Sequence, residues 1–360
     1  MIRQLKKFTL QMVAGANIAT ILIMLVIGYS GYLNPVRHPM IANLGLTFPA
    51  FLLINMGFLV FWIIFRLKGA IIPIAGFLIC YAPIRTFFPL NIPKDPPKGA
   101  LKVLSYNVWH FAEGQEVENG RTAILDYILQ QHADIVCLQE ASSGKLEEVD
   151  SMMKKQFPYQ ASADSPGKER LSIFSKYPIL GQEKIDYVSK GNLSAAFKLD
   201  IEGDTVFVIN NHLETTGLSI EDKAQFKNLI KGNLNRKESQ HESQRLIDKL
   251  GKASAIRAPQ AEAVARYIQD HKKMSIICCG DFNDGPLSYA HRTIAKGLTD
   301  CYVETGNGPG ISYHRGGFYV RIDNIICSKD LKPFKCKVDT KISTSDHYPI
   351  YCWIKKRAKP

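Results

Sequence analysis

Two long stretches without a charged side chain dominate the first third of the chain. No Asp, Glu, Lys or Arg occurs over residues 9–36 or over residues 39–65. A helix needs about 20 predominantly apolar residues to cross the roughly 30 Å of hydrocarbon in a bilayer. Both stretches are long enough, so we expect transmembrane helices at about 10–33 and 41–65. Buried core helices are the alternative interpretation of such runs.

A third apolar stretch is shorter and interrupted. Residues 69–84 carry no charge, but Arg85 follows and separates them from a further apolar segment. An arginine near the end of a span can extend its guanidinium to the interface, which would lengthen the span to about 69–88. A re-entrant or surface-lying segment is the alternative. We therefore expect a membrane region over residues 1–90 with two to three spans, followed by a Pro-rich linker at 91–99.

The net charge of +12 is distributed unevenly. Residues 1–99 hold nine Lys or Arg and a single acid and contribute +8, so the remaining 261 residues contribute only +4. Basic residues favour the cytoplasmic side of a membrane, and here they flank the first two spans: Arg3, Lys6, Lys7, Arg66 and Lys68. Three spans then place the chain after residue 90 outside the cytoplasm, whereas two spans leave it inside. We expect an integral protein of the inner or plasma membrane with an extracytoplasmic C-terminal part.

The last 260 residues alternate between strand and helix patterns. A helix is expected at 122–131, and two or three helices are expected in the polar stretch 219–271. Short apolar runs predict buried strands, and these are 101–106, 134–138, 171–175, 194–199, 205–210, 275–279, 319–327 and 348–354. The alternation predicts an α/β domain over residues 100–356.

Polar residues able to bind metal or phosphate stand at or near the ends of six of these strands. The short motifs are Tyr106-Asn107, Gln139-Glu140, Asn211-His212, Asp281-Phe282-Asn283, Ile322-Asp323 and Asp346-His347. Strand ends and loops on a rigid scaffold are where catalytic side chains are commonly found. Each motif alone has an ordinary structural explanation as a turn or a solvated strand end. Their combination and order carry the functional signal.

Together these motifs resemble the endonuclease/exonuclease/phosphatase superfamily, which includes pancreatic-type deoxyribonucleases, apurinic endonucleases, neutral sphingomyelinases and inositol-phosphate phosphatases. The resemblance covers about residues 100–356 and leaves the apolar N-terminal part outside it. It implies a four-layer α-β-β-α sandwich as the catalytic domain, here preceded by a helical transmembrane region. It also implies divalent-metal-dependent hydrolysis of phosphoesters.

The residue types suit this chemistry, because phosphoester hydrolysis develops negative charge on oxygen atoms that a cation and hydrogen-bond donors can stabilise. Mg²⁺ prefers hard oxygen ligands. The resemblance implies Glu140 as the first ligand of Mg²⁺ (or Mn²⁺), with Asp346 and the amide oxygen of Asn107 assisting. Glu140, Asp281 and Asp346 would also repel one another in one pocket unless a cation compensated them.

The same resemblance implies the catalytic roles. Asp281 orients or deprotonates the attacking water, and Asn283 donates to the phosphate or its transition state. Asp323 fixes the tautomer of His347, which holds the phosphate or acts as a base. His212 stabilises the transition state or protonates the leaving oxygen, since an imidazole titrates near neutrality.

His212 would need an acidic partner. The segment Lys168-Glu169-Arg170-Leu171 resembles one in pancreatic-type deoxyribonucleases, which would make Glu169 that partner. Arg170 is either part of this arrangement or a surface charge.

We expect a membrane-anchored, metal-dependent phosphodiesterase or phosphatase, with lipid headgroups as a possible substrate. A metal-dependent nuclease acting on DNA or RNA is the first alternative, although the C-terminal part lacks a long basic and aromatic stripe that would follow a nucleic-acid backbone. A non-catalytic membrane protein of the same fold is the second alternative. The expected partners are the membrane and a phosphoester, and no feature indicates an obligate protein partner.

Overall fold

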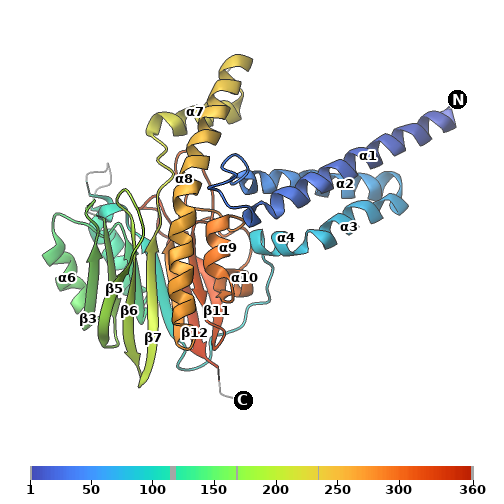
Figure 1. Ribbon diagram of the computed structural model, residues 1–360. Coiled ribbons are helices and arrows are strands. Elements are labelled where there is room, and N and C mark those ends of the chain that lie inside the picture. Colours follow the sequence, from blue (N-terminus) through green and yellow to red (C-terminus); the bar gives the residue numbers. More distant parts are fainter. Residues whose placement is uncertain (1, 114–118, 168, 234, 358–360) are drawn as a thin grey trace.

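The computed structural model describes residues 2–113, 119–167, 169–233 and 235–357. Figure 1 shows a group of N-terminal helices that extends away from a sandwich of two sheets. The N-terminal group contains the helices α1 (Ile2–Gly28), α2 (Phe48–Phe65), α3 (Ile71–Ile79) and α4 (Tyr81–Phe87), with short 3-10 turns η1 (Ser30–Tyr32), η2 (Leu44–Thr47) and η3 (Leu67–Ala70).

Two of these helical segments are long and apolar enough to span a membrane, and they are Gln4–Tyr32 and Leu44–Phe65. The third expected span is a pair of helices, Leu67–Ile79 and Tyr81–Phe87, bent by 68° at Cys80. Pro83 lies just beyond the bend, and a proline removes one backbone donor from the helical ladder. The pair counts as a third span only if both halves cross together.

Polar side chains join α1 to α2 inside the helical group. The Asn17 Nδ2 donates to the Asn55 Oδ1 at 2.9 Å, and the Trp62 Nε1 donates to the Asn17 Oδ1 at 3.2 Å. All three side chains are buried. Hydrogen bonds between amide and indole groups of this kind fix the rotation of one apolar helix against another.

Two six-stranded sheets form the body of the C-terminal part. The first sheet has the order β11 (Leu331–Val338), β12 (Ile350–Lys356), β1 (Leu101–Asn107), β2 (Ile135–Gln139), β4 (Arg170–Ser175), β3 (Tyr159–Asp164). The second has the order β5 (Ile179–Ile185), β6 (Leu193–Ile201), β7 (Asp204–His212), β8 (Ser275–Asp281), β10 (Asp323–Cys327), β9 (Thr299–Asp300).

Three apolar clusters define four layers. One cluster lies between the sheets and includes Val103, Ile173, Phe197 and Ile277. A second joins the first sheet to α5 (Gly120–Gln130) and α6 (Leu146–Lys154). The third joins the second sheet to α8 (Arg236–Asp270) and α9 (Tyr289–Ala295). The remaining helices are η4 (Trp109–Ala112), α7 (Ile220–Lys231) and α10 (Cys301–Thr305). The expected α-β-β-α sandwich is confirmed.

Some sequence expectations need correction. The strand expected at 319–327 begins only at Asp323, because Val320 instead forms an isolated bridge with Tyr313. The strands β3, β5 and β11 were not expected; β5 is exposed along most of its length, so it lacks the apolar signal of a buried strand. The polar stretch 219–271 forms two helices, α7 and the 35-residue α8.

The sandwich contacts the helical group through the loop that follows β8. Leu287 packs in an apolar cluster with Met24, Ile27, Phe48 and Cys80. A Cβ atom on Gly31 would come within 2.3 Å of the Leu287 carbonyl oxygen, so the two backbones touch there. Figure 1 shows α9 beside the ends of the N-terminal helices. The two regions therefore form one continuous packed body.

Candidate active site

The parallel strand pairs of the two sheets bring the expected site residues to one end of the sandwich. In the first sheet β1 pairs with β2, and Asn107 faces Gln139 in the register. In the second sheet β7 pairs with β8, which places His212 opposite Asp281. Asp323 of the antiparallel β10 also faces Asp281. The carboxyl ends of the central strands thus converge at one edge.

A buried amide pair locks the sheets together beneath this edge. The Gln139 Nε2 donates to the Asn210 Oδ1 at 2.6 Å and to the Ser105 Oγ at 3.2 Å. The Asn210 Nδ2 donates back across the interface to the Leu138 carbonyl oxygen at 3.0 Å. These contacts fix the spacing of the two sheets, and with it the distance between site residues that different sheets supply.

Asn107 links the carboxylates of the two sheets. Its Nδ2 donates to the Glu140 Oε1 at 2.9 Å and to the Asp281 Oδ2 at 3.2 Å. Its Oδ1 accepts from the Trp109 backbone N–H at 3.1 Å. The amide nitrogen therefore faces the carboxylates, and Asn107 would have to turn its amide to offer oxygen to a metal there.

Glu169 occupies the position expected for the partner of His212. Its Oε1 lies 3.2 Å from the His212 Nδ1 and accepts the Glu140 backbone N–H at 2.9 Å. Glu140 itself has a φ of +51°, which turns its side chain off the end of β2. Arg170 points elsewhere and forms an ion pair with Asp164 at 3.1 Å, so of the two alternatives it is a surface charge.

The acids around His212 set its charge. Burial alone would lower the pKa of His212, but Glu169, Asp281 and Glu140 raise it to about 9. The His212 Nε2 lies 3.7 Å from both the Glu140 Oε1 and the Asp281 Oδ2. This nitrogen faces the cavity that the carboxylates line.

Asp281 is held from several sides. Its Oδ1 accepts the Asn283 backbone N–H at 2.7 Å, and its Oδ2 accepts the Asn283 Nδ2 at 3.3 Å. Burial raises the pKa of Asp281 to about 6, although His347 and His212 act in the opposite direction. Asn283 also donates to the Leu213 carbonyl oxygen at 3.0 Å, which fixes its orientation.

Asp323 and His347 form the expected buried pair. The His347 Nδ1 lies 2.8 Å from the Asp323 Oδ2, and its Nε2 lies 3.7 Å from the Asp281 Oδ2. Burial alone would lower the pKa of His347, but the charges of Asp323 and Asp281 raise it well above its usual value. Six of the eight expected residues line one small cavity, and they are Glu140, His212, Asp281, Asn283, Asp346 and His347. The other two contact these lining residues: Asn107 bonds to Glu140, and Asp323 pairs with His347.

The donor set fits a hard divalent cation. Carboxylate oxygens crowd the cavity, and the Asp323 Oδ1 is buried without a hydrogen-bond partner among the described residues. Of the part of the chain that the structure describes, one group of three acids or histidines has ligand atoms within 4.8 Å of one another, and it is Asp281, Asp323 and His347. Glu140 and Asp346 line the same cavity outside that group.

Two features of the site were not expected from the sequence. The buried Arg257 of α8 lies 3.2 Å from the Asp284 Oδ2 and donates to the Glu214 carbonyl oxygen at 3.0 Å. Lys223 of α7 donates to the Tyr313 hydroxyl at 2.7 Å on the opposite wall. Both come from the polar stretch 219–271, whose alternating charges resemble those of any solvated helix face.

Sequence and structure comparisons agree with this geometry. Residues 104–347 match the Endonuclease/Exonuclease/phosphatase family, and residues 10–87 match a domain of unknown function, DUF8431. The first match covers most of the chain, so the protein belongs to the Endonuclease/Exonuclease/phosphatase family. No curated protein sequence matches the chain.

Several solved structures share the fold. Truncated TDP2 from Caenorhabditis elegans has a TM-score of 0.52 at 15% identity, covering 72% of this chain and 99% of its own. The human Nocturnin catalytic domain with bound sulfate has a TM-score of 0.52 at 17% identity, covering 72% and 95%. Sphingomyelinase C from Streptomyces griseocarneus has a TM-score of 0.51 at 16% identity, covering 71% and 99%. At these identities the likeness establishes the fold.

Proposed function

We propose that the protein is a membrane-anchored, divalent-metal-dependent phosphoester hydrolase. One observation carries this proposal: six of the eight expected polar side chains, supplied at strand ends and adjoining loops of both sheets, line a single cavity of about 150 Å³, and the other two bond to them. Burying acids and histidines together costs folding free energy, and such clusters with perturbed pKa values are found preferentially at functional sites. Membership of the family supports hydrolysis of a phosphoester as that chemistry.

In the proposed reaction, a water oxygen bonds to phosphorus, the ester P–O bond breaks, and the leaving oxygen takes a proton. Asp281 accepts a proton from the attacking water, and Asn283 beside it donates to a non-bridging oxygen. Asp323 keeps a proton on the Nδ1 of His347. The His347 Nε2 then faces the phosphate. These roles follow the geometry of the hydrogen bonds around each group.

His212 occupies the opposite side of the cavity from the Asp323–His347 pair. Glu169 at its Nδ1 holds the ring so that the Nε2 points toward Glu140 and Asp281. We assign it the stabilisation or protonation of the leaving oxygen. Glu140, Asp346 and Asn107 would hold Mg²⁺ or Mn²⁺, after rotation of the Asn107 amide. Such a cation, when bound, neutralises charge on the phosphate oxygens.

The proposal places the sandwich outside the cytoplasm. Lys6 and Lys7 lie at the far end of α1 from the sandwich, and Arg66 and Lys68 lie between α2 and α3. Both groups are at the end of the helical group that points away from the sheets (Figure 1). Basic residues favour the cytoplasmic side, which supports an extracytoplasmic sandwich. A reporter fused after Pro360 measures this sidedness directly.

The enzymatic proposal is tested with the full-length chain in detergent. The panel contains bis(p-nitrophenyl) phosphate, phosphatidylcholine vesicles, an inositol phosphate and a single-stranded oligonucleotide, each with Mg²⁺ and with chelator. We expect metal-dependent release of product from at least one phosphoester and its loss in Glu140→Gln. Arg170→Ala removes an ion pair with Asp164 and a hydrogen bond to the Ser162 Oγ, none of which lines the active-site cavity, so it is the matched control and keeps the activity. No turnover of any phosphoester with Mg²⁺ or Mn²⁺ contradicts the proposal, and cleavage of the oligonucleotide alone identifies a nuclease.

A further inference from the structure

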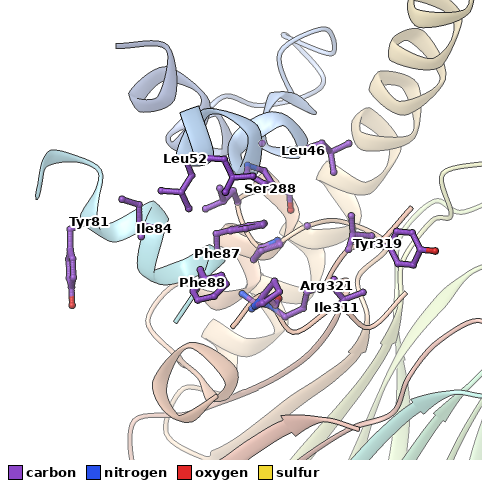
Figure 2. Close-up of a pocket in the computed structure, with 18 of the residues that line it drawn as sticks. Leu46, Leu52, Tyr81, Ile84, Phe87, Phe88, Ser288, Ile311, Tyr319 and Arg321 are labelled. Atoms are coloured by element: carbon purple, nitrogen blue, oxygen red, sulfur yellow. The ribbon is translucent and has the colours of Figure 1, made fainter. Parts of the chain in front are cut away.

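A second and larger cavity lies where the N-terminal helices meet the sandwich (Figure 2). Its volume is about 980 Å³. Side chains of α2, α3 and α4 line one side, and the loops at 284–288 and 309–321 line the other. Figure 2 shows Leu52, Ile84 and Phe87 on the helical side and Tyr319 and Arg321 on the sandwich side. We refer to this space as the junction cavity.

The polarity of the junction cavity changes from one end to the other. On the helices its walls are Leu, Ile, Met, Phe and Pro, and Tyr81 is the single lining residue there with a polar group among the described residues. Asn43, Asp284, Ser288 and Arg321 supply polar groups at the sandwich end. This profile matches an amphiphile with a long apolar part and a polar head.

The junction cavity and the active-site cavity share a wall. Five residues line both of them, and they are Asn43, Leu46, Asp284, Gly285 and Val320. Asn43 and Leu46 belong to the segment between α1 and α2, so the N-terminal region itself forms part of the active site. Asp284 and Gly285 directly follow Asn283. A Cβ at Gly285 would have no heavy atom within 4 Å, so the space beside this shared residue is open.

The junction cavity also opens sideways along the expected spans. Leu53 of α2 and Leu78 of α3 line it and are still 66% and 71% exposed. From Pro49 to Leu59, its extent along α2 is about 15 Å at the helical rise per residue. This is close to half of the roughly 30 Å hydrocarbon core. The cavity therefore has the depth of a single leaflet, on the side of the sandwich.

The volumes of the active-site cavity and the junction cavity indicate that each accommodates a different part of a substrate. Pockets that bury a small molecule measure about 300–1,000 Å³. The active-site cavity of about 150 Å³ is smaller than this range and accommodates little more than a phosphoester group. The junction cavity falls at the top of the range. A substrate that fills both has a small phosphorylated head and a bulky apolar remainder.

We propose that the substrate is a membrane lipid phosphoester whose acyl chain lies in the junction cavity while its phosphorus reaches the active site. The inference rests on the proposed phosphoester hydrolase function and adds the class of substrate to it. The lipid comes from the leaflet next to the sandwich and moves in laterally between α2 and α3. The N-terminal region thus supplies a binding surface for the substrate in addition to its anchoring role.

A nucleic acid does not suit this second cavity. Its phosphates would enter an apolar groove in which the helices offer no cation and a single hydroxyl, and burying a charge without a partner is strongly unfavourable. Arg321 at the sandwich end is itself buried, and it donates to the Thr86 and Pro309 carbonyl oxygens. It positions the α4 end against the loop at 309–321, and its guanidinium is already bonded to backbone.

Binding is tested separately from turnover. The full-length protein in phosphatidylcholine nanodiscs is irradiated with a hexadecylphosphonate that carries a diazirine at the end of its chain. A phosphonate has a carbon–phosphorus bond that hydrolysis of an ester leaves intact, so Mg²⁺ can be present throughout. We expect labelling near Leu59 and Ile74, the deep end of the cavity. Labelling spread evenly over the outer surface of α1 and α2 would overturn the inference, whatever the turnover results.

Two double variants of α2 provide a matched comparison. Leu53→Trp with Met56→Trp fills the cavity at positions that are 66% and 51% exposed. Val60→Trp with Ile64→Trp adds the same bulk outside it, at positions that are 56% and 67% exposed. We expect labelling to fall at least fivefold in the first variant and to remain unchanged in the second. Equal labelling in both variants would also overturn the inference.

Turnover measurements then test whether the apolar tail of the substrate contributes to the reaction. The p-nitrophenyl esters of hexadecyl phosphate and methyl phosphate share one leaving group and differ only in the tail. We expect the hexadecyl ester to have a kcat/KM at least 100-fold higher, and the cavity-filling variant to lose at least tenfold on this ester while turning over the methyl ester normally. Equal kcat/KM values for the two esters overturn the lipid inference and leave a phosphoester hydrolase. Specific labelling without turnover of either ester supports the lipid site and contradicts the hydrolase.

Discussion

The helix α2 and the strand β8 are both rich in apolar residues, yet they differ in which side chains they bury. All seven residues of β8 are buried, as expected for a central strand between two layers. In α2 the buried residues are Phe48, Asn55 and Trp62, while Leu53, Ile63 and Ile64 are more than half exposed. The helix therefore places a polar amide inside and aliphatic side chains outside.

This difference is explained if water surrounds one region and lipid surrounds the other. In water, exposure of so many large aliphatic side chains on adjacent helices would drive association. In a bilayer the same side chains are solvated by lipid, and only polar groups need partners inside. We therefore interpret the sandwich as solvated by water and the helical group as adapted to lipid, in line with the proposed membrane anchoring. The two regions are packed against each other at Leu287. We therefore expect substitutions in the two regions to differ in their effects on activity and stability.

The largest effect is expected from loss of a catalytic side chain, and all of the side chains with a proposed catalytic role belong to the sandwich. His347→Ala removes the imidazole that Asp323 orients and should lower kcat by about 10²–10⁴-fold, the usual range for an acid–base group. Steady-state turnover of the best substrate in the panel measures this loss. Labelling by the diazirine phosphonate at the deep end of the junction cavity should persist, because the helices alone form that end. An active His347→Ala protein would contradict the assigned role.

A smaller but still large effect is expected at the Arg257–Asp284 pair. The Arg257 side chain is buried and that of Asp284 is only 10% exposed, so Arg257→Met leaves an uncompensated carboxylate beside the junction cavity. Breaking a buried pair costs about 3–5 kcal/mol of unfolding free energy. Urea titration followed by tryptophan fluorescence measures this. Arg257→Met with Asp284→Leu should recover most of the loss, and Arg170→Met should cost less than about 1 kcal/mol because its pair is exposed. Equal costs for both arginines would show that the loop is solvated.

The backbone contact between the regions is expected to tolerate no added methyl group. Gly31→Ala places a Cβ 2.3 Å from the Leu287 carbonyl oxygen, and backbone on both sides cannot yield easily. Overpacking of this kind costs about 1–3 kcal/mol. A lower thermal unfolding midpoint is the measured result. Gly15→Ala is the control, because a Cβ there has no neighbour within 4 Å and alanine favours the helix α1, so the midpoint should not fall. A neutral Gly31→Ala would mean that the two regions do not touch as described.

The smallest loss of stability is expected at two buried amide pairs, one in each region. Asn55→Leu breaks the 2.9 Å hydrogen bond to Asn17 between membrane helices and should cost about 0.6–1.7 kcal/mol. Asn210→Leu breaks the 2.6 Å hydrogen bond to Gln139 between the sheets and should cost about 1–3 kcal/mol. Detergent unfolding of the helices and urea unfolding of the sandwich provide the two measurements. A larger cost for Asn55→Leu would contradict the lipid-adapted interpretation of the helices.

Much of this organisation could be predicted from the sequence. Charge-free runs predict spans because length and hydropathy are local properties. Buried central strands such as β2 and β8 are predictable because they are almost entirely apolar. The site residues were accessible because they stand at the ends of those strands in a recognisable order. Pairing of Glu169 with His212 also agrees with the family resemblance.

Other features depend on contacts that a linear pattern does not contain. The exposed strand β5 has no buried face of its own to give an apolar alternation. The Arg257–Asp284 pair joins residues 27 positions apart on different elements, and neither stands out among the charges around it. The bend at Cys80 and the junction cavity depend on how α2, α3 and α4 pack against the sandwich.

The loop after β8 has a mechanical consequence. Five residues separate Asp281, which lines the active site, from Leu287, which packs among the N-terminal helices. Because this segment is short, we expect a tilt of the helices to move the end of β8. Under the proposed membrane-anchored function, the active site would lie at a fixed height above the bilayer. Its rate should respond to bilayer thickness, and a single residue inserted between Asn283 and Leu287 should disturb catalysis more than the same insertion within the exposed linker at 91–99.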